Sequence, residues 1–146
     1  MARTVIAVIA GYITMFILMF VTFTCAFLLM GTEWSFKPAS CEASNAWVAM
    51  SLVSGLIISI VAGFICALIA RGGKAPVILA VVVFVLGLVL AIPSVIAHQQ
   101  NAGKVRAGNV TQAEAMQNAV EPIWVPFTFP IIGAVGVLIG GKLRKR

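Results

Sequence analysis

The chain has 146 residues, of which 62% are hydrophobic and 10% charged, and its formal net charge is +6. Water-soluble domains are about half apolar and about a quarter charged, so this composition excludes an ordinary soluble core. It also leaves little room for a separate soluble catalytic module.

All charged residues lie outside four uncharged stretches, at 4–32, 43–70, 75–103 and 122–141. A hydrocarbon core needs only about 20 apolar residues at a rise of about 1.5 Å each. We therefore predict an all-α integral membrane protein in which residues 1–146 form one domain. Its four transmembrane helices, at about 4–30, 46–70, 75–97 and 122–141, form an up-down bundle with outer loops at 31–45 and 98–121.

Basic residues are distributed unequally between the two ends of these spans. One side carries Arg3, Arg71, Lys74, Lys142, Arg144, Lys145 and Arg146, and the other carries Lys37, Lys104 and Arg106. The positive-inside rule then predicts that both termini are cytoplasmic, and short loops are typical of a bacterial inner membrane. The basic C-terminus is expected to attract anionic lipid, whereas the pattern gives no indication of a nucleic-acid partner.

The first span is predicted to be a retained signal anchor, because its apolar run to Met30 is much longer than the roughly 7–15 residues of a signal peptide core. Its polar side chains, Tyr12 and Thr14 among them, are expected to bond their own backbone or a neighbouring helix. In the loop that follows, Glu42 precedes a helix start, as Glu121 does later, where an acidic side chain complements the helix dipole.

The second span has a small residue at every fourth position, namely Ser51, Gly55, Ser59, Gly63 and Ala67. Residues four apart share one helix face, so these five form a smooth stripe that another helix backbone can approach closely. Two interpretations stay open: the stripe packs against other spans of the same bundle, or it binds a second chain.

The third span is almost entirely aliphatic, with Gly87 and Pro93 as interruptions. We expect this helix to have the greatest lipid contact. In the loop after it, Thr111 and Glu114 have the spacing of a capping box and predict a short helix to about Val120, lying on the membrane surface.

Pro122, Pro126 and Pro130 recur every four residues in the fourth span. Each interior proline removes a backbone donor and costs about 3 kcal/mol in a regular helix, so this helix is predicted to be kinked. The kinked part is either a candidate binding site, as broken helices are in transporters, or a bent helix anchored at the interface by Trp124 and Phe127.

Residues for chemistry are few, since the chain has no aspartate, four glutamates and a single histidine, His98. A membrane haem, a zinc site and a two-carboxylate active site all need more ligands or acids than are present. Cys25 and Cys66 lie at different depths and cannot form a disulfide, whereas Cys41 could join a partner chain. We therefore predict no enzyme activity, no cofactor and no metal.

No ionisable residue lies within the spans, which argues against ion-coupled transport. The favoured interpretation is a non-catalytic accessory or scaffold subunit that packs against a larger membrane complex through the stripe of the second span and the outer loops. The alternative is a homo-oligomeric passive pore or carrier for a small neutral or lipid-like solute, lined by the proline-rich half of the fourth span. An enzyme acting on lipid or quinone through His98 or a loop glutamate, and a membrane-stress sensor, are weaker hypotheses.

Overall fold

The computed structural model describes residues 2–71, 74–101, 103, 105, 108 and 111–144, without the side chains of 112, 115 and 116. Within these residues the helices are α1 (Ala2–Ser35), α2 (Asn45–Ala70), α3 (Ala75–Asn101), α4 (Gln112–Asn118) and α5 (Val125–Leu143). All but α4 are long and apolar enough to cross a membrane. The prediction of an all-helical protein with four spans is confirmed.

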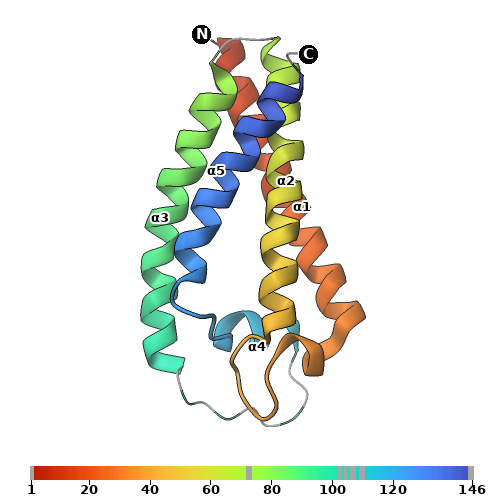
Figure 1. The fold of residues 1–146 in the computed structure, drawn as a ribbon, viewed down its shortest axis with the longest axis vertical. Coiled ribbons are helices and arrows are strands. Elements are labelled where there is room, and N and C mark those ends of the chain that lie inside the picture. The colour runs from red at the N-terminus through yellow and green to blue at the C-terminus, as the bar shows by residue number, and fades with distance from the viewer. Residues whose placement is uncertain are drawn as a thin grey trace.

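The four long helices run alongside one another, with both termini at one end of the bundle and α4 and the long loops at the other (Figure 1). We call these the terminal end and the loop end. Helix α5 packs against α2 and α3, and α1 packs mainly against α2, with far less contact between α1 and α3. Toward the loop end, α1 leans away from α5 (Figure 1).

Close backbone contact between α2 and α5 holds the terminal end together. A Cβ atom added at Gly63 would lie 2.7 Å from the Val137 Cα atom, and one added at Gly140 would overlap the Ile60 carbonyl oxygen. Only glycine therefore fits at these two positions. In a bilayer such van der Waals contact between small residues is the main source of helix association, because lipid is as apolar as the helices.

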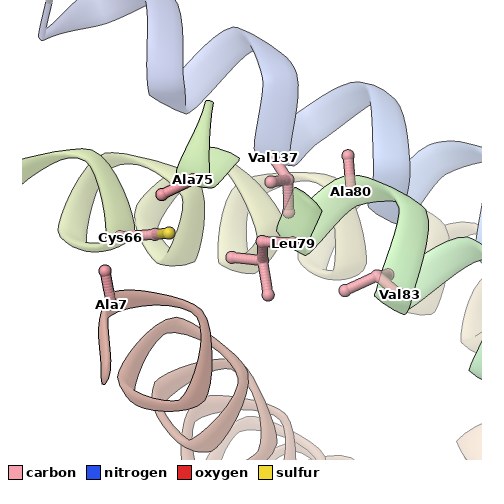
Figure 2. Packing of buried hydrophobic residues seen from close by; sticks show 7 residues of the cluster. All are labelled: Ala7, Cys66, Ala75, Leu79, Ala80, Val83 and Val137. Carbon is pink, nitrogen blue, oxygen red and sulfur yellow. The ribbon is translucent and has the colours of Figure 1, made fainter. Parts of the chain in front are cut away.

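The other helices join this end through a buried cluster of small and aliphatic side chains. Figure 2 shows Ala7 of α1 next to Cys66 of α2, with Leu79 of α3 and Val137 of α5 beside them. Leu79 and Val137 are fully buried. The cluster thus brings all four membrane-spanning helices together.

Helix α1, rather than α3, is the least buried span. Only 11% of its most apolar window is buried, against 33% for α3. The expectation that the third span has the greatest lipid contact is therefore wrong. The reason is that α5 covers one side of α3. The two helices are so close there that a Cβ atom added at Gly87 would lie 2.6 Å from the Pro130 ring.

The helix ends differ from the predicted spans by a few residues. Helix α1 continues to Ser35, although its backbone is interrupted at Gly31, where φ is 70° and ψ is 179°. Helix α3 continues to Asn101, so His98 lies in a helix and not in the predicted loop. Helix α5 begins at Val125, and Pro122 therefore precedes it.

At the loop end the loop between α1 and α2 pairs through its backbone with the segment that follows α4. The Ala43 N–H donates to the Val120 carbonyl at 2.9 Å, and the Val120 N–H donates to the Cys41 carbonyl at 2.9 Å. The predicted capping box is present, since the Thr111 N–H donates to Glu114 Oε2 at 2.9 Å. The pairing leaves Val120 outside α4, which ends at Asn118.

Candidate functional site

Two adjoining cavities lie toward the loop end of the bundle. The first, of about 330 Å³, lies among α1, α2, α3 and α5, and the second, of about 620 Å³, lies among α1, α2, α5 and the paired loops. Both are bordered by Phe16, Met19, Glu121 and Phe129. We refer to the two together as the loop-end cavity.

Aromatic and methionine side chains form most of the wall that α1 contributes. Phe16, Phe20, Phe23 and Phe27 border the second cavity. Their spacing of four, three and four residues places them along one side of the helix. At the terminal end small residues allow the helices to pack closely. At the loop end, where these large side chains lie, α1 is farther from the other helices.

The opposite wall of the first cavity comes from α3 and α5. Pro126, Phe129 and Pro130 of α5 border it together with Gly87 and Leu90 of α3. A proline ring at Pro126 is tolerated because that position is in the first turn, where the backbone N–H has no partner within the helix. Two of the three prolines singled out in the sequence therefore border the cavity.

Two of the residues that border the first cavity are exposed side chains of neighbouring spans. Phe16 on α1 is 66% exposed and Leu90 on α3 is 61% exposed, and both border this cavity. In a membrane these two side chains would face the hydrocarbon region, because both lie within apolar spans.

Buried residues from the end of α1 and from the loop after it border the second cavity toward the loop end. Ser35, Phe36 and Ala43 border the second cavity and are 2%, 6% and 3% exposed. The Ser44 N–H donates to the Ser35 carbonyl at 2.9 Å, and this bond holds the end of α1 next to the start of α2. On the α2 side, Trp47 packs against Phe23 and Phe27, with ring centroids 6.0 and 6.3 Å away.

Glu121 is the acidic residue that borders both cavities. Its side chain forms no hydrogen bond or ion pair within the part of the chain that the structure describes. Burial raises the pKa of its carboxyl group, because a charged form is poorly solvated there. The sequence suggested mainly a helix-dipole role for this residue.

The backbone around Glu121 is held from two sides. His98 Nδ1 lies 2.9 Å from the Glu121 carbonyl oxygen, so a protonated Nδ1 donates to it. The preceding residue, Val120, forms two backbone hydrogen bonds with the loop between α1 and α2. The carboxyl group is therefore fixed in position by α3 and by the paired loops.

Other polar groups in the cavity are few. Ser94 borders the first cavity, but its hydroxyl donates to the Leu90 carbonyl at 3.2 Å. Tyr12 also borders this cavity, and its hydroxyl forms no hydrogen bond within the described residues. The cavity is thus apolar along its length, with a carboxyl group at the loop end and a phenol on α1.

The five small residues of the second span, Ser51, Gly55, Ser59, Gly63 and Ala67, lie along a face that is largely occupied by α5. Ser59 occupies the space that the absent side chain of Gly136 leaves, and Gly63 contacts the Val137 backbone. Gly55 faces the Phe129 ring, which would lie 3.3 Å from a Cβ atom added at that glycine. Nearer the terminal end, the Arg144 guanidinium donates to the Ala67 carbonyl at 2.6 Å. A second chain would therefore have to bind another surface.

The remaining candidates do not form a reactive site. Cys25, Cys41 and Cys66 are free thiols. Among the described residues, no three His, Cys, Asp or Glu side chains lie close enough to hold a metal ion. His98 contacts the backbone of Glu121 through its Nδ1 atom.

Comparison of the chain with protein families, with curated proteins and with solved structures finds no match. The site itself is therefore the basis for assigning a function.

Proposed function

We propose that the protein is a non-catalytic carrier that binds a lipid-like solute and holds its apolar chain in the loop-end cavity. The observation that carries this proposal is an apolar cavity bordered by exposed side chains of two spans, Phe16 of α1 and Leu90 of α3, between which we place its opening. A solute dissolved in the bilayer could enter there directly.

The size and lining of the cavity suit such a solute. Small-molecule sites in proteins have volumes of about 300–1,000 Å³, with mostly apolar walls and a few polar groups. The cavities of about 330 and 620 Å³ lie in this range. Phe129 and Met19 border both, and the flexible methionine side chain can adapt to chains of different shape.

A carrier fits the packing better than a pore through the monomer does. At the terminal end α2 and α5 are in backbone contact, with Gly63 against Val137 and Gly140 against Ile60. This contact leaves no space between the two helices for a passing solute. The cavity is therefore proposed to bind at one end of the bundle, and release would return the solute to the same side or require α5 to move.

We place this end in the outer leaflet, because the positive-inside rule puts the termini in the cytoplasm, most simply of a bacterial inner membrane. We also propose that α5 bends at Pro130, since a proline ring inside a helix displaces the carbonyl four residues earlier. The glycine at position 87 supports this, because it provides the space that the Pro130 ring occupies.

An accessory or scaffold subunit of a larger complex is the second candidate. The observation that favours it is the low burial of α1, 11% in its most apolar window. The sequence favoured this role because of the small-residue face of α2, but α5 covers most of that face. A partner would have to bind α1, which lipid can cover equally well, so we rank this role below solute binding.

Quenching of tryptophan fluorescence by a brominated long-chain alcohol tests the carrier proposal. In one variant Trp47, which borders the second cavity, is the sole tryptophan. In the control the sole tryptophan is Trp124, which is 54% exposed and is not among the residues that border either cavity. Both are placed in nanodiscs of unbrominated lipid.

Solute binding predicts that quenching of Trp47 saturates at a low mole fraction of the alcohol. Quenching of Trp124 should rise in proportion to the alcohol, because it reports only random collisions. Proportional quenching of both tryptophans would show that no site exists in the cavity.

A further inference from the structure

Headgroup chemistry must decide which solute occupies the loop-end cavity, if the proposed function holds. An apolar chain that leaves the bilayer for the cavity exchanges one apolar environment for another, so its burial contributes little net free energy. Selectivity then depends on the polar groups in the wall. Glu121 is the acidic one and borders both cavities.

The carboxyl group of Glu121 lacks a positive partner among the described residues. The nearby Lys37 is engaged elsewhere, since its Nζ lies 2.7 Å from Glu42 Oε2. His98 directs its Nδ1 to the backbone oxygen of Glu121 and not to the carboxyl group. A carboxylate that is largely removed from water without a partner is costly, and a cation placed beside it would offset that cost.

A bound metal ion does not suit this position. Calcium takes six to eight oxygen ligands and zinc takes four, whereas the described residues bring no three His, Cys, Asp or Glu side chains together. An organic cation needs only one carboxylate and can bring an apolar chain with it. An anionic headgroup would be repelled by the same charge.

We propose that the preferred ligand of the cavity is a cationic amphiphile, whose positive headgroup pairs with the Glu121 carboxylate while its chain lies along Phe16, Met19 and Phe129. This inference rests on the proposed function and specifies its substrate class. The chain would extend from Glu121 toward Tyr12, which borders the same cavity.

Displacement of the brominated alcohol from the Trp47 variant tests the headgroup preference. Three competitors with the same chain are compared in neutral phosphatidylcholine nanodiscs: tetradecyltrimethylammonium, tetradecanol and tetradecyl sulfate. The quaternary ammonium keeps its charge at every pH. We expect it to displace the probe at a mole fraction about tenfold lower than tetradecanol, with the sulfate weakest.

Glu121→Gln should abolish the tenfold preference, so that the ammonium and tetradecanol displace the probe at similar mole fractions. The matched control is Glu42→Gln, which removes a negative charge from the same end of the molecule but not from the cavity wall, and it should retain the preference. Glu121→Ala serves as a second variant should the glutamine variant fail to fold.

A preference for the ammonium that survives in both Glu121 variants, or equal displacement by all three competitors, would overturn the inference while the carrier proposal stands. If the brominated alcohol shows no saturable quenching of Trp47, the carrier proposal itself fails and the inference fails with it. The two failures are therefore distinguishable in one assay.

Discussion

Two glycines on the same face of α2 should respond very differently to the same substitution. Gly63→Ala places a Cβ atom 2.7 Å from the Cα atom and 2.8 Å from the carbonyl carbon of Val137. Both are backbone atoms of α5 and cannot turn aside. At Gly55 the nearest atom to an added Cβ is Cε1 of the Phe129 ring, at 3.3 Å, and that ring borders a cavity into which it can move.

The size of the effect at Gly63 follows from the required displacement. Carbon atoms in contact are about 3.5–4.0 Å apart, so α2 and α5 must separate by about 1 Å. Overpacking of this kind costs about 1–3 kcal/mol, partly offset by the roughly 1 kcal/mol by which alanine exceeds glycine in helix propensity. Because the atoms that must move are backbone atoms, we expect the upper end of that range, about 3 kcal/mol, which leaves a net loss of about 2 kcal/mol for Gly63→Ala and no loss for Gly55→Ala.

The midpoint of unfolding by sodium dodecyl sulfate in mixed micelles, followed by circular dichroism, measures the difference. The two variants are matched in residue type, helix and face, so effects on insertion or on the unfolded chain should be alike. A Gly63→Ala protein as stable as the unmodified one, or a Gly55→Ala protein that is the less stable of the two, would refute the backbone contact between α2 and α5.

Three further predictions concern single side chains. Burial raises the pKa of Glu121, so the folded state loses stability as the pH rises from the ordinary glutamate pKa to the raised value. Glu121→Gln should therefore be more stable than the unmodified protein in micelle unfolding at neutral pH. The difference should vanish in acid. The hydrogen bond from Lys37, and then the charge of Lys37, lower the pKa of Glu42. In Lys37→Met, titration followed by nuclear magnetic resonance should show the pKa of Glu42 raised toward its ordinary value. An unchanged pKa would exclude the ion pair between Lys37 and Glu42. Removing the bond to the Ala67 carbonyl in Arg144→Met should speed amide hydrogen exchange over the last turn of α2, and unaltered exchange there would contradict the contact.

The four spans were predictable because a bilayer imposes length and apolarity on each helix separately. The charged residues marked their limits to within a few positions. The ends could not be read as well, because tertiary bonds decide them. Helix α3 runs on past the predicted residue 97 to Asn101, where the Asn101 side chain donates to the Gln117 carbonyl at 3.3 Å and His98 bonds Glu121. Hydropathy carries no information on such bonds.

The cavity was not predicted, because it depends on how the helices diverge. Glu121 was interpreted as a helix-dipole residue, because an acidic side chain just before a helix that begins with proline complements the helix dipole. One signal was available: phenylalanines at 16, 20, 23 and 27 share one side of α1 and indicate a face that is either lipid-exposed or lines a cavity. Combined with Pro126 and Pro130, which the sequence did mark as a candidate site, this row could have suggested the location.

Native mass spectrometry of the protein, extracted from its own membrane at native expression in mild detergent, tests the central claim most directly. Solute binding in the loop-end cavity predicts a mass equal to the chain, or to a multiple of it, plus one retained amphiphile per chain that is lost at high activation energy. A fixed mass that includes a different polypeptide would establish an accessory subunit, and a bare chain without any retained amphiphile would contradict solute binding.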